Sequence, residues 1–383
     1  MGLLMRRILI IIVAAGMAGC SGLKLASPLR HQETAILMHG ARPSRNNELT
    51  GIPSPPLSLE WEGDVTAGIG DGAPCLVDSI LISGNLRGEL YAFNATSGKR
   101  LGWVTLGGAI QGSPVIAGNL AIVPLSGGRE SVVAYDLMEG KVRWHYAGGD
   151  IHVSPLLLGT FLYVANTNGV MTCLTLSAGE KIWTYALPSN TTLKGIRSSP
   201  AGQDSSVVFG ADDGYLYCCD ARTGSFRWRV NAGGPVQATP VIHDGMVFVG
   251  TLAGTFVAVR LNDGVLQWTG NPGAQIYGAA IVDSSHVIVG TTGGHIVAMD
   301  PASGKVRWDS DLRSPVDSGL LGAGDLLYAG TLKKEFIALK RSTGEVIWRT
   351  ITAGRIKTTP VGGLGRVFVA QDSPVIQAFR GAQ

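Results

Sequence analysis

The eight tryptophans of this chain recur at a nearly constant interval. Successive gaps of 42, 41, 39, 45, 40, 40 and 40 residues separate Trp61, Trp103, Trp144, Trp183, Trp228, Trp268, Trp308 and Trp348. A period close to forty residues indicates one structural unit used many times. Most of these tryptophans end a similar phrase, such as "CDARTGSFRW" at 219–228 or "DPASGKVRW" at 300–308. A catalytic loop would occur once, so we interpret the phrase as a structural clamp in which the Trp docks between units.

Each period contains four short strand patterns. Residues 235–270 carry "PVQATPVI", "MVFVGT", "TFVAVRL" and "VLQWTG", which are rich in Val, Ile, Phe and Thr. The breaks "HDG", "LAG" and "NDG" supply the residues that favour turns. No segment has a helical period. Four antiparallel strands in about forty residues are typical of one blade of a β-propeller.

The two ends of the chain predict how the ring closes. Three strand patterns follow Trp348, namely "GRIKTTPV", "RVFVAQ" and "VIQAFR", and the fourth is missing. A matching pattern, "LSLEWEG", contains Trp61 near the other end. We therefore predict an all-β fold over residues 57–383: an eight-bladed β-propeller of four-stranded antiparallel blades. The N-terminal strand joins three C-terminal strands, which removes the free edges.

The first nineteen residues are typical of a secretory signal. Arg6 and Arg7 precede an apolar run from Ile8 to Ala15, which is too short to span a bilayer as a helix. The ending Met-Ala-Gly-Cys resembles the lipobox of bacterial lipoproteins. That resemblance predicts removal of residues 1–19 and acylation, including palmitate, at Cys20. Secretion without a lipid is the alternative.

The next segment, residues 20–56, is polar, contains Pro and Gly, and lacks a strong period. We expect it to be a lipidated tether between the membrane and the ring. Ser21 follows the Cys, which by analogy with enteric lipoproteins favours the outer membrane and its periplasmic face. Loss of Arg6 and Arg7 leaves 29 basic residues against 28 acidic ones, a balance that gives no support for nucleic-acid binding.

One polar position recurs in the first strand pattern of every blade, three residues before the Pro slot. Because the first strand of a blade lines the central channel, these side chains should form a ring near the channel mouth. An ordinary wetted channel lining is the alternative to a binding site. The predicted polar ring consists of Asp71, Gln111, His152, Arg197, Gln237, Tyr277, Asp317 and Lys357.

The single long period, 45 residues, adds chain between the third and fourth blades. Extra length in an inter-blade loop is where function is often added. The loop "LPSNTTLKGIRSSP" offers Leu193, Lys194, Ile196 and Arg197, an apolar and basic mixture suited to a protein partner. A solvated connection without a partner is the alternative.

The adjacent Cys218 and Cys219 fill a small-residue slot and an apolar slot of the repeat, on opposite faces of one strand. We predict two buried thiols rather than a disulfide, although the oxidising envelope leaves a disulfide open. The seven histidines show no spacing suited to a metal. We therefore predict neither a metal site nor catalytic residues.

The repeat resembles the tryptophan-docking motif of the quinoprotein (PQQ) propellers, over residues 57–383. Together with the lipobox and the chain length, it resembles the BamB family of lipoproteins of the outer-membrane β-barrel assembly machinery. That family docks on the barrel subunit BamA through the loop between blades three and four, with a Leu-Arg-Gly run. Here "LKG", Leu193 to Gly195, occupies the comparable stretch. The family's nearby acidic pair has no counterpart in "GGPVQATP".

The resemblance implies a scaffold without a cofactor and without catalysis. It would be monomeric within a complex that holds a BamA-like barrel subunit and further lipoproteins. Two alternatives stay open. One is a PQQ-dependent or other cofactor-binding quinoprotein enzyme, and the other is a periplasmic propeller that binds a ligand at the polar ring.

Overall fold

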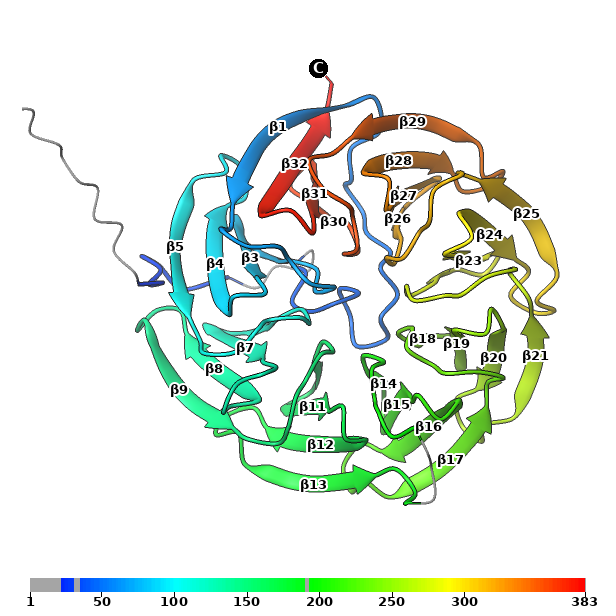
Figure 1. Cartoon of the computed structure of the whole chain (residues 1–383), viewed down its shortest axis with the longest axis horizontal. Coiled ribbons are helices and arrows are strands. Elements are labelled where there is room, and N and C mark those ends of the chain that lie inside the picture. The colour runs from blue at the N-terminus through cyan, green and yellow to red at the C-terminus, as the bar shows by residue number, and fades with distance from the viewer. Residues whose placement is uncertain (1–21, 31–34, 190–192, 383) are drawn as a thin grey trace, which may run out of the picture.

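The computed structural model describes residues 22–30, 35–189 and 193–382. Their strands form eight four-stranded antiparallel sheets around a central axis, as Figure 1 shows. The prediction of an all-β, eight-bladed propeller is confirmed. The described residues contain no helix that is long and apolar enough to cross a membrane.

Each blade begins with a short strand beside the channel and ends with a long strand at the rim (Figure 1). From the channel outwards, blade 1 consists of β2 (Cys75–Val77), β3 (Ile80–Gly84), β4 (Glu89–Asn94) and β5 (Arg100–Thr105), and blade 2 consists of β6 (Val115–Ala117), β7 (Leu120–Pro124), β8 (Val132–Asp136) and β9 (Lys141–Tyr146). Blade 3 consists of β10 (Leu156–Leu158), β11 (Phe161–Ala165), β12 (Val170–Thr175) and β13 (Lys181–Ala186). Blade 4 consists of β14 (Ala201–Gln203), β15 (Ser206–Gly210), β16 (Tyr215–Asp220) and β17 (Phe226–Asn231).

Blades 5 to 7 repeat the pattern. Blade 5 consists of β18 (Val241–His243), β19 (Met246–Gly250), β20 (Phe256–Arg260) and β21 (Leu266–Gly270), and blade 6 consists of β22 (Ile281–Val282), β23 (Val287–Gly290), β24 (His295–Met299) and β25 (Val306–Asp311). Blade 7 consists of β26 (Leu321–Ala323), β27 (Leu326–Gly330), β28 (Glu335–Lys340) and β29 (Val346–Ile351). The middle strands of the blades are almost wholly buried and supply most of the apolar core.

Blade 8 contains both ends of the propeller sequence. Its order from the channel outwards is β30 (Val361–Gly363), β31 (Arg366–Ala370), β32 (Val375–Gly381) and β1 (Leu57–Asp64). The antiparallel register places Trp61 opposite Ala378. Glu60 of β1 also forms ion pairs with Arg366 and Arg380. The predicted closure by the N-terminal strand is confirmed.

Six tryptophans pack against a turn of the next blade. Trp228 donates a hydrogen bond from Nε1 to the carbonyl of Leu261, 2.9 Å away. Its ring lies on Gly264, which has a φ of +73° and where a Cβ would meet the indole at 2.7 Å. Glycine is required there by both its backbone conformation and the close approach. The same hydrogen bond and glycine contact are made by Trp61, Trp144, Trp183, Trp228, Trp268 and Trp308.

Trp103 departs from the docking position that the repeat predicts. In blade 1, Ala92 lies opposite Gly102, whereas in other blades the equivalent Ala lies opposite the Trp. Trp103 therefore stands one residue out of register and packs on Tyr91. The turn carbonyl that it would have reached, at Leu137, instead accepts a hydrogen bond from the backbone of Leu25, 2.7 Å away. Residues 22–30 thus fill the seam between blades 1 and 2.

Trp348 keeps the regular register, opposite Ala338, but finds no docking turn. In blade 8 the third and fourth strands come from opposite ends of the chain, so the turn that would join them does not exist. Trp348 instead packs edge-on against Phe336 and Phe379. The structure therefore assigns the docking role to six of the eight tryptophans.

Residues 35–53, which we call the clasp, run across the channel. Ile36 and Met38 are buried, and Arg45 is fully buried. In Figure 1 the clasp appears as the blue loop in the centre of the ring. Its hydrogen bonds reach the innermost strand of every blade, or the residue just before it, at Leu76, Ile116, Pro155, Gly202, Ile242, Val282, Gly322 and Pro360.

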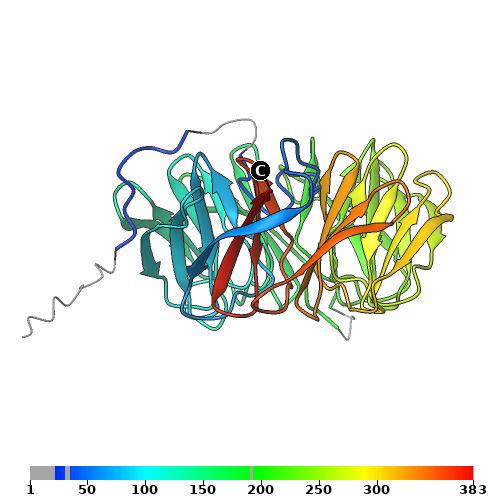
Figure 2. The ribbon, with the colours of Figure 1, turned by 90° about the horizontal axis from the view of Figure 1, so that it is seen from above.

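The expected tether over residues 20–56 is wrong for most of the segment that the structure describes. Leu23 and Leu25 are buried against blades 1 and 2, and the clasp is buried in the channel. The segment lacks a strand period because its residues contact different blades in succession, so no periodic face is required. Figure 2 shows the described part of this N-terminal segment, in dark blue, at one face of the ring.

Candidate functional site

The polar ring forms one site in the channel. A cavity of about 250 Å³ opens there, and all eight predicted ring residues line it. Each ring residue precedes the innermost strand of its blade, and seven of the eight immediately follow a buried aliphatic residue, whereas Gly70 separates Asp71 from Ile69. The repeat therefore places them at one depth, as the sequence pattern predicts. The lining comprises Asp71, Gln111, His152, Arg197, Gln237, Tyr277, Asp317 and Lys357, together with His39, Ser318 and smaller neighbours.

Three ring members are held by partners outside the ring. Gln111 donates from Nε2 to Ser126 Oγ at 2.8 Å. Arg197 forms an ion pair with Asp212, and Gln237 donates to the other carboxylate oxygen of Asp212 at 2.9 Å. The charge of Arg197 is thus neutralised within blade 4.

The two carboxylates of the ring differ from these three. Within the described part of the chain, no hydrogen bond or ion pair holds Asp71 or Asp317. Burial raises the pKa of Asp71, against the charges of Lys357 and His152. Burial also raises the pKa of Asp317, as does the charge of Asp71, while Lys357 opposes the shift. Lys357 is thus near enough to act on both through space.

Two other ring members, His152 and Tyr277, are neutral at pH 7. Burial lowers the pKa of His152, which favours the uncharged imidazole. Burial, and then the charge of Asp317, raise the pKa of Tyr277. The Tyr277 side chain is partly exposed, and it lines the cavity beside Asp317.

The clasp closes the cavity from below. His39 lines the cavity, and its Nδ1 is buried without a hydrogen-bond partner among the described residues. Burial, and then the charge of Arg45, lower the pKa of His39 to about 3. His39 is therefore neutral at physiological pH. Its place in the site could not be predicted from the sequence, because the clasp carries no repeat pattern.

Arg45 lies behind His39 with none of its surface exposed. Its guanidinium donates to the carbonyl oxygens of His39 at 2.7 Å, Pro155 at 2.8 Å and Pro200 at 2.8 Å, with a longer bond to Ser154. Burial lowers the pKa of Arg45 to about 9, which leaves it protonated at neutral pH. Arg45 joins the clasp to blades 3 and 4 through carbonyl groups.

The candidate partner loop is described from Leu193 onwards. Leu193 is 55% exposed, and Lys194 is exposed beside it. The residues that follow are fixed: Asp212 donates its backbone N–H to Gly195 at 2.9 Å, and Ile196 donates to Asn166 at 3.2 Å. The exposed Leu193 and Lys194 are therefore followed directly by residues whose backbone is hydrogen-bonded to blades 3 and 4, and we call these residues the base of the loop.

Ile196 does not belong to an exposed partner surface. It is 1% exposed and lies in the core of blades 3 and 4. The expectation that it binds a partner is therefore wrong. The sequence contained the signal, because the residue directly before the ring position is aliphatic in seven blades: Ile110, Ile151, Ile196, Val236, Ile276, Val316 and Ile356. In blade 1 the aliphatic residue, Ile69, lies one position earlier. Arg197 lines the cavity and pairs with Asp212 instead of standing free.

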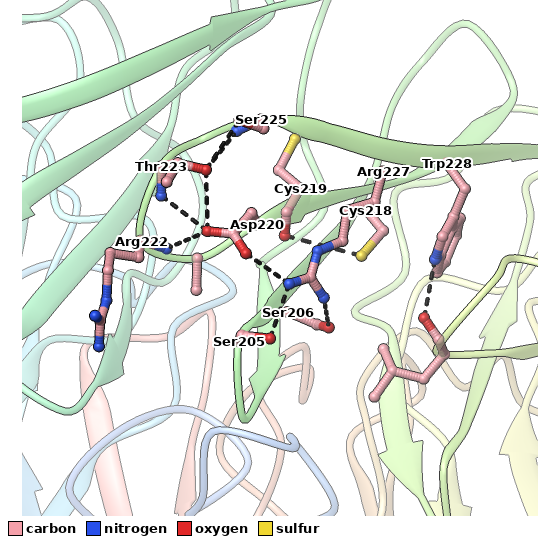
Figure 3. A network of polar contacts seen from close by, with 12 residues as sticks. Ser205, Ser206, Cys218, Cys219, Asp220, Arg222, Thr223, Ser225, Arg227 and Trp228 are labelled. Carbon is pink, nitrogen blue, oxygen red and sulfur yellow. Dashed lines mark hydrogen bonds and ion pairs between the residues drawn. The ribbon is translucent and has the colours of Figure 1, made fainter.

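Cys218 and Cys219 are free, buried thiols that belong to different core clusters. Figure 3 shows their sulfur atoms on opposite sides of β16. Burial raises the pKa of both thiols to about 12. The same view shows the structural role of the repeated phrase. Asp220 accepts backbone hydrogen bonds across its turn, and Arg227 ties that turn to β15 (Figure 3).

The last two predictions from the sequence concern metal binding and lipidation. In the described ranges, no group of three or more His, Cys, Asp or Glu residues is arranged to hold a metal ion. Cys20, the predicted lipidation site, lies outside the described residues.

This ring defines an eight-bladed propeller of the quinoprotein type. BamB from Moraxella catarrhalis superposes with a TM-score of 0.74 at 19% identity, covering 85% of this chain and 99% of that one. A quinohemoprotein alcohol dehydrogenase from Comamonas testosteroni superposes with a TM-score of 0.75 at 13% identity, covering 91% and 81%. At such identities the two matches establish the fold and leave the function open.

The sequence identifies the family. The family model for outer membrane protein assembly factor BamB matches residues 58–197, 189–319 and 293–383, and the chain belongs to that family. Relatives of that name include proteins from Kangiella koreensis, 26% identical over 45% of this chain and 46% of that one, and from Shewanella oneidensis, 27% identical over 40% and 41%. The chain thus matches less than half the length of these relatives.

Proposed function

We propose that this protein is a non-catalytic scaffold lipoprotein of the outer-membrane β-barrel assembly machinery. It would stand on the periplasmic face of the outer membrane, anchored by a lipid on Cys20. The loop between blades 3 and 4 would hold a BamA-like barrel subunit, and further lipoproteins would join the same complex. Membership of the BamB family and the name shared by its relatives support this assignment.

The observation that carries the docking proposal is the exposure of Leu193 on a fixed base. Covering an exposed apolar side chain is favourable, and a backbone that is already hydrogen-bonded next to it loses little conformational entropy on binding. Lys194 beside it adds a positive charge that can select an acidic partner surface. A few residues carry most of the binding energy of a protein interface, so two side chains in this position can decide whether a partner binds.

A scaffold role also agrees with how the chain uses its reactive groups. The thiols of Cys218 and Cys219 are inert because burial raises their pKa values. Six of the eight tryptophans are engaged in blade docking and are unavailable to stack on a cofactor. The rigid ring would raise the local concentration of a partner at the membrane without making or breaking bonds.

The docking proposal is tested by replacing both exposed loop residues, Leu193→Ala and Lys194→Ala, in the tagged full-length protein. After purification from detergent-solubilised envelopes, quantitative mass spectrometry measures the barrel subunit that copurifies. We expect recovery to fall by about tenfold or more, the loss typical of an interface anchor. The thermal unfolding temperature should stay unchanged, because both side chains are exposed.

Blade 3 offers a matched control in Lys181→Ala with Ile182→Ala. These residues are also a lysine beside an exposed apolar side chain, but they lie on the rim strand β13. This control variant should recover the barrel subunit at the wild-type level. Equal recovery by the loop variant and the wild type would eliminate the loop as the docking site.

A further inference from the structure

We infer that the cavity in the channel binds a small organic molecule that carries one primary ammonium group. Asp71 and Asp317 would accept its charge, and Ser318 Oγ and His39 Nδ1 would take part in its hydrogen bonds. This site is separate from the loop that we propose as the protein-docking surface, so the two proposals can fail independently.

The sign of the ligand follows from how the charges of the wall are distributed. Arg197 is neutralised by Asp212, and the pKa shifts of His39 and His152 leave both imidazoles uncharged. Two carboxylates and one lysine then remain on the side of the cavity formed by blades 7, 8 and 1. Their sum is one negative charge when both acids are ionised. A ligand with a single positive charge would balance it.

Unpaired polar atoms indicate that this wall is built to meet a polar group. Ser318 is 3% exposed, and its Oγ has no hydrogen-bond partner among the described residues. His39 Nδ1 is also buried and has no hydrogen-bond partner among the described residues. Buried polar atoms are nearly always paired, and an orphan atom lowers stability. The residues Ser318 and His39 line the same cavity as Asp71 and Asp317, and an ammonium group has three donors to offer.

The shape of the cavity limits the size of the ligand. The clasp closes the channel beneath the ring, so the ligand must fit a space of about 250 Å³ and enter from the mouth. Tyr277 lies next to Asp317 in the ring and presents an aromatic surface, which can contribute a cation–π contact. A metal ion is a poorer match, because the described residues offer no cluster of three ligating side chains.

The test uses three probes of equal length and different charge: butylammonium, 1-butanol and butyrate. Dissociation constants are measured by saturation-transfer NMR on the full-length protein in a non-ionic detergent. We expect butylammonium to bind, and to bind about tenfold or more tightly than either of the other two, the difference typical of a charge-assisted hydrogen bond. Preference for butyrate, equal binding of all three, or no binding of butylammonium would overturn the proposal.

Substitutions of cavity residues show whether butylammonium binds in the cavity. Asp71→Asn, Asp317→Asn and Ser318→Ala should each weaken butylammonium binding, the two Asp variants by about tenfold. Asp325→Asn removes the same charge from an exposed turn of blade 7 and should bind butylammonium like the wild type. Unfolding temperatures establish that each variant is folded. Wild-type affinity in both cavity Asp variants would exclude the cavity as the binding site.

Discussion

Single residues place charges of both signs in the channel, at different depths. Asp71 and Asp317 face the cavity without direct partners, whereas Arg45 lies beneath it and donates to carbonyl oxygens. A buried charge destabilises a fold unless hydrogen bonds or an opposite charge compensate it. Arg45 has such hydrogen bonds, and the two acids do not. Asp71 is exposed to the cavity and Asp317 is half-buried, and the pKa of each is raised, so ionisation of either acid at neutral pH reduces stability.

We predict that Asp71→Asn stabilises the protein at pH 7. Because the folded-state pKa of Asp71 lies above its unfolded value of 3.8, the folded protein binds this proton more tightly than the unfolded chain does. Stability from this group is present at low pH and is lost as pH rises above the unfolded pKa. The variant cannot ionise there and avoids the loss. Lys357, His152 and Asp317 act on Asp71 and remain in the variant.

Urea unfolding of the wild type and Asp71→Asn at pH 4 and pH 7 measures this effect. The gain of the variant over the wild type should be larger at pH 7 than at pH 4. A variant that is less stable than the wild type at pH 7 would show that Lys357 already compensates the carboxylate in full.

At the scale of elements, the seams between blades are closed in three ways. Six seams use a tryptophan on a glycine turn, and the seam between blades 1 and 2 uses residues 22–30. The seam between blades 7 and 8 uses the edge-on packing of Trp348 against Phe336 and Phe379. The backbone N–H of Leu25 replaces an indole N–H at the same turn carbonyl. The N-terminal segment is thus part of the propeller.

These differences predict unequal effects of two apparently equivalent substitutions. Trp228→Ala removes a buried ring and a hydrogen bond between blades, and should lower the free energy of unfolding by about 3–5 kcal/mol. Trp103→Ala should lower it by less than half of that, because Trp103 is half-buried and does not dock. Chemical denaturation of the two variants measures both values. Equal losses would contradict the assignment of Trp103.

At the scale of the whole molecule, the ring is closed twice. Strand β1 completes blade 8 at the rim, and the clasp bonds to all eight blades inside the channel. The clasp also gives the channel a floor, so the two faces of the molecule differ. A polar cavity opens on one face, and the N-terminal segment crosses the other (Figure 2).

We predict that Arg45→Ala destabilises the propeller by about 3–5 kcal/mol, because buried carbonyl groups in the clasp and in blades 3 and 4 lose their donor. Arg42→Ala provides the control, since Arg42 is exposed in the same clasp. Thermal unfolding of both variants measures the difference. Indistinguishable unfolding temperatures would mean that the clasp adds nothing to the stability of the ring.

Positions that recur in every period could be predicted from the sequence because a ring converts a repeat into a symmetric arrangement in space. The polar ring at Asp71 and its seven counterparts is such a set, and so are the two slots that hold Cys218 and Cys219. Ile196 belonged to another recurring set, and comparison across the blades would have identified it as core. Each of these features depends only on the position of a residue within the repeat.

Features without a period depended on the tertiary structure. The clasp, with His39 and Arg45, contacts each blade only briefly, so no hydrophobic alternation records its position. The displacement of Trp103 arises from one extra residue between its turn glycine and the tryptophan, and its meaning depends on Leu25 occupying the vacated turn. The sequence by itself determined the blade, the number of blades and the polar ring, because the repeat sets short-range pairing. Tertiary structure decided what closes the channel, because contacts between segments far apart in the chain leave no regular pattern in either segment.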